Sequence, residues 1–397
     1  MLKTLGFGVA LTLAMGLSAH AADAPGVTAT EIKIGGVYPF SGPASSIGVV
    51  GKAVSAYVQS INDHGGINGR KINYIALDDA YSPPKTVEQI RKLVESDDVS
   101  FIFGQLGTPG ITATAKYLMT RHIPLVAGVS GSNKFTVIKD YPYMTTGLVS
   151  FFNEGKIYAK YLDRALPGGK YGILYQNDDF GKDYVNAFKA YFGADFDKRV
   201  VIQPYEVTDP TVDSQIVTMK SLGAQALLLA GTPKFSAQAI RKASEMGWKP
   251  TIILDYPSAS VASTLKPAGL DKSAGVLAGT FIKDPTDAQW DNDPGMKRYR
   301  EFFAKYLPGS DIADSNYLNG FQQGIVLEQV LKQCGNDLSR ENIRKQARSL
   351  VDLTLPTALP GIKVNTSDTR NMMWTQLRLQ RWTGTTWELF GDILEAN

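Results

Sequence analysis

The feature that most constrains the fold is a regular alternation of short apolar runs with stretches of helical pattern. Apolar runs of strand length occur at 32–37, 72–77, 101–104, 172–175, 226–229 and 252–254. Between them lie amphipathic stretches such as 50–61, in which apolar residues fall on one helical face. Continuous apolar runs suit strands that are covered on both faces. The alternation therefore predicts an α/β protein with doubly wound parallel sheets.

The length of the chain indicates more than one hydrophobic core. It has 397 residues, whereas single cores rarely extend beyond about 250–300 residues. We therefore expect two lobes. The segment 143–150, where the chain is expected to leave the first lobe, is not rich in Pro, Gly or Ser. The join is thus predicted to be an ordered hinge that closes the lobes around a ligand.

The N-terminus has the features of a secretory signal peptide in their usual order. Lys3 precedes an almost wholly apolar run at 5–17, and a small-residue A-x-A cleavage motif follows at 19–21. A membrane anchor is the alternative, but a spanning helix needs about 20 apolar residues and this run is shorter. We expect residues 1–21 to be removed and the mature protein to begin at Ala22, free in the periplasm.

The chain lacks the residue patterns of most catalytic and metal sites. After the signal peptide only His64 and His122 remain, and no His or Cys spacing typical of a transition-metal site occurs. The segment 128–132, Gly-Val-Ser-Gly-Ser, is like a nucleophile elbow but ends in Ser instead of Gly. The single cysteine, Cys334, excludes an intramolecular disulfide. We expect no enzymatic activity, no metal and no cofactor.

The charge composition argues against nucleic acid as a binding partner. The 41 basic residues nearly balance the 38 acidic ones, and no basic stripe suited to a phosphate backbone occurs. Two acidic pairs, 78–79 and 178–179, stand at the ends of predicted strands. We interpret them as turns or helix caps rather than as the flanking acids of a glycosidase.

Four polar, Gly-containing loops follow predicted strands, at 40–48, 105–109, 128–133 and 176–181. In open parallel sheets, ligands bind at the carboxyl ends of the strands. The first three loops offer hydroxyls and backbone N–H groups beside helix N-termini, a combination that binds carboxylates without a charged side chain. The fourth offers the aromatic face of Phe180 to an apolar body. The loops predict a site for a small, partly apolar carboxylate.

These residues give the chain a family resemblance. Its marks are Ser41-Gly42-Pro43 after the first strand, the Gly-rich turn 65–70, Asp179-Phe180-Gly181 and Tyr317 in a late helix. Together they resemble the leucine/isoleucine/valine-binding type of periplasmic ABC-transporter receptors, the type I periplasmic binding proteins. The resemblance covers the mature chain and implies two α/β lobes joined by a three-crossover hinge. The implied lobes are 22–144 with 284–350, and 145–283 with 351–397.

The resemblance also implies roles for individual residues. Thr108 matches the family's hydroxyl donor to the ligand carboxylate, the turn 130–132 its second carboxylate-binding loop, and Phe180 its aromatic wall from the second lobe. Ile47 matches a wall residue. The predicted ligand-binding residues are Ser41, Ile47, Gln105, Gly107, Thr108, Ser130, Gly131, Ser132, Phe180, Thr232, Asp255, Tyr256 and Pro257.

Two departures from the family pattern bear on the ligand. Amino-acid-binding members place an acid in the second lobe to hold the ligand's ammonium, and Pro257 stands there in this chain. Burying an ammonium without a counter-charge is costly, so the sequence favours an aromatic or other non-amino carboxylate. If Asp255 turns into the cleft, an amino acid remains open. Tyr81 and Gly107 stand where some relatives carry a disulfide.

The expected function is capture of the solute by hinge closure and its delivery, by a monomeric binding protein, to an ABC permease and ATPase complex in the inner membrane. A ligand that bridges both lobes binds the closed state better and shifts the population towards it. The alternative is a periplasmic sensor subunit whose closed form signals to a membrane partner.

Overall fold

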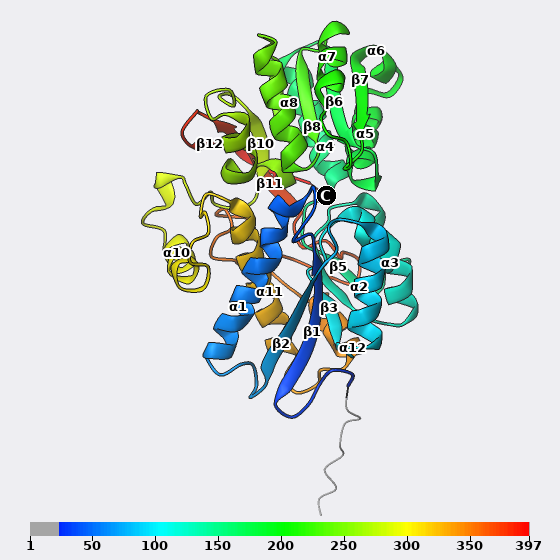
Figure 1. Ribbon diagram of the computed structural model, residues 1–397, viewed down its shortest axis with the longest axis vertical. Helices are drawn as coiled ribbons and strands as arrows, with labels where there is room; N and C mark the ends of the chain where they lie inside the picture. The colour runs from blue at the N-terminus through cyan, green and yellow to red at the C-terminus, as the bar shows by residue number, and fades with distance from the viewer. Residues whose placement is uncertain (1–23, 397) are drawn as a thin grey trace, which may run out of the picture.

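The computed structural model describes residues 24–396, which form two α/β lobes joined at a hinge (Figure 1). The first lobe carries the blue and cyan segments together with the gold and orange helices, and the second is mostly green. The predicted signal peptide lies outside the described residues. Among the helices of 24–396, none is both long and apolar enough to cross a membrane.

The first lobe is built on a five-stranded sheet in the order β2-β1-β3-β4-β5, with every neighbouring pair parallel. Helix α1 packs against α11 on one face, and α2 packs against α3 on the other. The strands are β1 (Glu31–Tyr38), β2 (Lys71–Asp78), β3 (Phe101–Phe103), β4 (Leu125–Gly128) and β5 (Met144–Thr146). The helices are α1 (Val49–Asp63), α2 (Pro83–Glu95), α3 (Thr108–Thr120), α10 (Pro294–Tyr306), α11 (Ser315–Cys334) and α12 (Arg340–Ala347).

The second lobe is built on a seven-stranded sheet in the order β12-β11-β10-β9-β8-β6-β7. The pairs from β10 to β7 are parallel, whereas β11 and β12 add an antiparallel hairpin. The strands are β6 (Tyr171–Gln176), β7 (Val200–Tyr205), β8 (Ala226–Ala230), β9 (Thr251–Leu254), β10 (Leu277–Thr280), β11 (Gln376–Trp382) and β12 (Trp387–Glu395). The helices are α4 (Phe151–Ala165), α5 (Asp179–Phe192), α6 (Phe196–Arg199), α7 (Asp213–Ser221), α8 (Pro233–Glu245) and α9 (Lys266–Ala268).

Short helical turns complete the two lobes. They are 3-10 helices at Ser45–Gly48, Asn133–Thr136, Gly193–Asp195, Tyr256–Ser258 and Ala288–Trp290, and a π-helical turn at Val261–Leu265. The turn at Tyr256–Ser258 begins two residues after β9 ends, so it places its side chains at the carboxyl edge of the second sheet. That edge is where the two lobes face each other.

The lobes are joined by three chain crossings that hydrogen-bond to one another. The Thr146 N–H donates to the Asn371 carbonyl at 2.9 Å, and the Met373 N–H donates back to Thr146 at 3.0 Å. The Lys283 N–H donates to the Thr357 carbonyl at 2.9 Å. This confirms the predicted architecture of two lobes on a three-crossover hinge. The first sheet extends through β5 to Thr146, beyond the lobe boundary predicted at 144.

Candidate ligand-binding site

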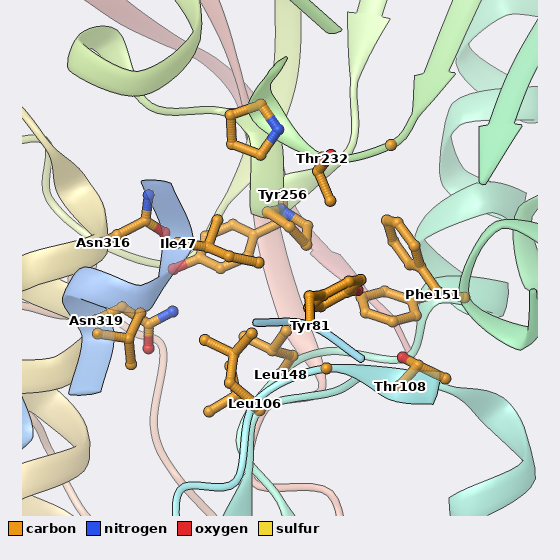
Figure 2. Close-up of a pocket in the computed structure, with 17 residues that line it drawn as sticks. Ile47, Tyr81, Leu106, Thr108, Leu148, Phe151, Thr232, Tyr256, Asn316 and Asn319 are labelled. Carbon is orange, nitrogen blue, oxygen red and sulfur yellow. The ribbon is translucent and has the colours of Figure 1, made fainter. Parts of the chain in front are cut away.

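A cavity lies between the two lobes, at the carboxyl ends of both sheets (Figure 2). Its volume is about 40 Å³, room for only a few water molecules, since each needs about 10–15 Å³. An organic solute needs more room than this, so the lobes must stand further apart when a solute is bound than they do here. The lining residues are Ile47, Val50, Tyr81, Leu106, Gly107, Thr108, Val129, Leu148, Phe151, Phe180, Gly231, Thr232, Pro233, Tyr256, Pro257, Asn316 and Asn319.

The chemistry of this lining is apolar and uncharged. Aliphatic and aromatic side chains make up most of it, and its polar side chains are hydroxyls and amides. No ionisable acid or base other than tyrosine occurs among these lining residues. Within 24–396, no group of three or more His, Cys, Asp or Glu side chains is arranged to hold a metal ion. The cavity suits a ligand with an apolar body and one polar end.

Two helix N-termini, one from each lobe, open onto the cavity. Helix α3 begins at Thr108 and α8 at Pro233, and neither has a side-chain cap or an acidic residue in its first turn. The Thr108 and Ser130 hydroxyls lie 2.8 Å apart, and the Ser132 N–H donates to Ser130 Oγ at 3.1 Å. Uncapped helix N-termini favour anions. The N-terminus of α3 therefore offers hydrogen-bond donors to an anion without carrying a formal charge.

Seven of the sequence-predicted residues line the cavity, and they come from both lobes. They are Ile47, Gly107, Thr108, Phe180, Thr232, Tyr256 and Pro257. Figure 2 shows Thr232 above the space and Thr108 below it to the right, with Tyr256 and Ile47 on the left. The structure thus brings together residues that lie more than a hundred positions apart in the chain.

The remaining predicted residues lie outside the lining. Ser41 is exposed and donates from its backbone N–H and its hydroxyl to Asp78, at 3.1 and 2.6 Å. Gln105 is buried and donates to the Thr114 hydroxyl at 2.9 Å. The residues at 130–132 are buried behind Thr108. Of these residues, Ser130 contacts the lining through its hydroxyl, which lies 2.8 Å from that of Thr108.

Asp255 lies next to the cavity but not in its lining. Its side chain is wholly buried and does not line the cavity, although the next two residues, Tyr256 and Pro257, do. Burial and the neighbouring Glu154 carboxylate raise the pKa of Asp255 well above its usual range. Asp255 therefore lies outside the lining in this closed arrangement, and the direction of its side chain could not be read from the sequence.

Glu154 is a second buried acid that the sequence did not indicate. Its carboxylate accepts hydrogen bonds from the Tyr158 hydroxyl at 2.5 Å, the Tyr184 hydroxyl at 2.7 Å and the Tyr256 N–H at 2.9 Å. Burial raises the pKa of Glu154 to about 7, although these three donors favour the charged form. Glu154 thereby fixes the backbone that carries Tyr256 into the cavity wall.

The cavity wall is joined to the hinge by a stack of three aromatic rings. Tyr256 stacks on Phe281 with centroids 4.3 Å apart, and Phe281 stacks on Trp374 at 4.5 Å, both at 26°. Phe281 follows β10 in the second crossing, and Trp374 precedes β11 in the third. Tyr256 is therefore linked, through direct ring stacking, to two of the three chain segments that form the hinge.

Phe180 is positioned by a helix cap. Asp178 precedes α5 and accepts from the Phe180 and Gly181 N–H groups at 3.0 and 3.3 Å. This is the capping role expected for that acidic pair. The Phe180 ring meets Phe151 edge to face, with centroids 4.9 Å apart. Together these two rings form the aromatic wall contributed by the second lobe.

Asn316 and Asn319 are lining residues that sequence reasoning missed. They stand three apart in the first turns of α11, so they share one helix face. Asn316 donates to its capping residue Asp314 at 2.8 Å, and Asn319 accepts from Gln323 at 3.4 Å. The spacing of two Asn residues near a helix start was the available signal. Their amides add donors and acceptors to the apolar wall.

The lobes also touch outside the cavity. Lys134 of the first lobe pairs with Asp179 of the second at 2.7 Å, and the Asn133 N–H donates to Asp183 at 2.8 Å. On the opposite side of the cleft, Lys266 pairs with Asp311 at 2.8 Å. The lobes are thus closed in this structure. The direct contacts between them stabilise the closed form in addition to any contacts made by a bound solute.

Loss of the Lys134 pair is expected to open the unliganded protein slightly. Exposed pairs contribute about 0.2–1 kcal/mol, so the open population of Lys134→Met should rise by up to about fivefold. Small-angle scattering would detect a larger radius of gyration, and high salt should have the same effect on the wild type. Lys92→Met is the control, because Lys92 pairs with Asp97 inside one lobe at 2.8 Å. Equal radii for both variants would contradict this role.

The fold and the cavity define a class: two-lobed proteins that enclose a small solute at a hinge. A family model described as "Periplasmic binding protein" matches residues 31–386. The chain belongs to this family. Its relatives are named as binding proteins, which agrees with the expectation that it is not an enzyme.

The similar proteins include one curated relative and two solved structures. "Leu/Ile/Val-binding protein homolog 7" of Brucella abortus (strain 2308) is 25% identical over 359 residues, covering 87% of this chain and 86% of that protein. A branched chain amino acid ABC transporter structure from Thermus thermophilus with bound valine has a TM-score of 0.82 at 16% identity, covering 92% and 97% of the two chains. A fatty acid ABC transporter substrate-binding protein from Thermomonospora curvata has a TM-score of 0.77 at 20% identity, covering 94% of each chain.

Proposed function

We propose that this chain is the solute-binding component of an ABC importer and captures a small, partly apolar carboxylate. The observation that carries the proposal is the uncharged cavity between the lobes, apolar on most sides and open to the N-terminus of α3. The two solved relatives support it, because valine and a fatty acid both join a carboxylate to an apolar body.

The carboxylate end is assigned to the first lobe. Thr108 lines the cavity at the start of α3, and its hydroxyl already lies within hydrogen-bond distance of Ser130. A ligand oxygen that replaces Ser130 as the partner of Thr108 would also meet the positive end of the helix dipole. The turn 130–132 supports this arrangement from behind rather than by direct contact.

The apolar end is assigned to the aromatic wall of the second lobe. Phe151, Phe180 and Tyr256 line this side, and such rings bury large apolar areas. An ammonium would find no carboxylate there, because Asp255 lies outside the lining. Burying an unpaired cation is costly, so we assign the ligand to the non-amino carboxylates.

Function follows from closure of the lobes. A solute that contacts both lobes binds the closed state better and raises its population. The closed protein then delivers the solute to a permease and ATPase complex in the inner membrane. We propose that the protein acts as a monomer in the periplasm after removal of residues 1–21.

The ligand class is tested with leucine and 4-methylpentanoate, which share one carbon skeleton and differ only by the amino group. We expect 4-methylpentanoate to bind at least tenfold more tightly, since a tenfold difference needs only about 1.4 kcal/mol and an unpaired buried ammonium costs more. Isothermal titration calorimetry measures both affinities, with benzoate as an aromatic carboxylate and valine as a second amino acid.

Two outcomes would overturn the assignment. Tight leucine binding that is abolished in Asp255→Asn would make Asp255 the partner of an ammonium. If none of the four acids binds or raises the melting temperature, the carboxylate proposal itself fails, because binding at about 100 times the dissociation constant stabilises by roughly 2.7 kcal/mol.

A further inference from the structure

Tyr81 enters the cavity from a turn that has unusual backbone geometry. Ala80 and Tyr81 have φ angles of 51° and 61°, in the left-handed region that costs non-glycine residues free energy. Buried Asp79 holds the turn: its carboxylate accepts from the Tyr81 N–H at 2.8 Å and from the Thr86 hydroxyl at 2.7 Å, while its carbonyl accepts from Ser82 at 2.9 Å. Such strain persists only where the surrounding structure imposes it.

The Tyr81 ring occupies space left by a glycine. Tyr81 is 7% exposed and lines the cavity. A β-carbon at Gly107 would lie 2.7 Å from Cε2 of this ring, closer than two carbons can approach. The absence of a side chain at Gly107 therefore lets the ring lie against the start of α3, beside Thr108. Figure 2 shows Tyr81 near the centre of the site, between Thr108 and Tyr256.

The hydroxyl end of Tyr81 reaches the opposite lobe. Its oxygen accepts from Gln176 Nε2 at 3.4 Å, and the same amide donates to Asp178 at 2.6 Å. Asp178 caps the helix whose first turn carries Phe180. Tyr81 is thus the part of the first lobe that spans the cleft and meets the residues that place the aromatic wall of the second lobe.

We propose that Tyr81 determines ligand size: its ring, held in the middle of the site between Thr108 and Tyr256, takes up space that a longer or bulkier apolar body would need, and so excludes such bodies. This inference rests on the proposed capture of a carboxylate and adds a specificity-determining residue to it. The rigid turn matters because a mobile ring would yield to a longer ligand, whereas a ring fixed by Asp79 and Gly107 must reject it.

The test uses acids that differ only in length: benzoate, phenylacetate, 3-phenylpropanoate and 4-phenylbutanoate, each titrated calorimetrically. We expect Tyr81→Ala to bind a longer acid best, with its preference for that acid over the wild-type optimum changed at least tenfold. Tyr81→Asn, which suits the left-handed turn, should give the same change and guards against misfolding of the alanine variant. Tyr81→Phe keeps the ring and should keep the wild-type order of affinities.

Leu93→Ala is the control for general destabilisation, because Leu93 is fully buried in α2 and does not line the cavity. It should lower the melting temperature without altering the order of affinities. If the wild type binds the series but both small variants keep its order, Tyr81 does not set ligand size. If the wild type binds none of these acids and none of the four tested above, the carboxylate proposal fails instead.

Discussion

Replacing Thr108 by valine is expected to weaken binding of the carboxylate ligand by roughly ten- to hundredfold. Valine keeps the shape of the side chain and removes the hydroxyl. A hydrogen bond to a charged group is worth about 1.5–3 kcal/mol, and about 1.4 kcal/mol corresponds to a tenfold change in affinity. The variant also leaves the Ser130 hydroxyl, which is 1% exposed, without the partner that lies 2.8 Å away.

Calorimetric titration with the tightest of the tested carboxylates measures this loss. Thr108→Ser restores a hydroxyl and should recover most of the affinity. Thr114→Val is the matched control on the same helix, because Thr114 is buried, bonds to Gln105 and does not line the cavity. Wild-type affinity in Thr108→Val would remove Thr108 from the carboxylate site.

The free energy of unfolding is expected to fall as pH rises from about 4.5 to 8. Burial raises the pKa of Glu154 from 4.5 to about 7 in the folded protein, so between these values the folded state binds more protons than the unfolded chain. The contribution of Glu154 to stability therefore decreases with pH in this window and levels off above it. A shift of this size corresponds to about 3 kcal/mol, since each pKa unit is worth about 1.4 kcal/mol.

Other carboxyls shape the same profile. Burial raises the pKa values of Asp178, Asp183 and Asp284 to about 6, which adds to the loss of stability above their usual range. The pKa values of Asp179 and Asp311 are lowered, with the paired lysines among the causes, so their contribution disappears only in stronger acid. Maximal stability is therefore expected in mildly acidic solution.

Urea unfolding at pH 5 and pH 8 tests this profile. Glu154→Gln keeps an acceptor for Tyr256 and Tyr158 but cannot ionise, so its loss of stability between the two pH values should be smaller than that of the wild type by about 2.5 kcal/mol. Glu88→Gln, at an exposed site on α2, should leave the difference unchanged. An equal loss in wild type and Glu154→Gln would show that Glu154 does not titrate in this window.

Much of the fold could be predicted from the sequence because its strands are marked by continuous apolar runs. The runs identified correspond to β1, β2, β3, β6, β8 and β9. The C-terminal hairpin was not predicted: β11 mixes exposed and buried positions, and β12 is largely exposed. The hairpin takes its place by pairing with β10, and β12 forms the edge of the sheet, so its position does not depend on its own apolarity.

The site could be predicted only where a residue follows its own strand. Thr108 and Phe180 start the helices after β3 and β6, so local order along the chain places them. The order of residues along the chain does not determine which way a side chain points within a turn. Asp255 lies outside the cavity lining, whereas Tyr81 is part of it. Asn316 was missed because it reaches the cavity only after the chain has crossed the hinge twice.

The aromatic stack of Tyr256, Phe281 and Trp374 couples order at the cavity wall to order at the hinge. Stacked rings favour one offset geometry by about 0.5–1.5 kcal/mol per pair, so the two stacks hold the cavity wall against the second-lobe ends of two crossings. A solute that restricts the Tyr256 ring therefore also restricts the chain at those two points, and the wall and the hinge lose conformational freedom together.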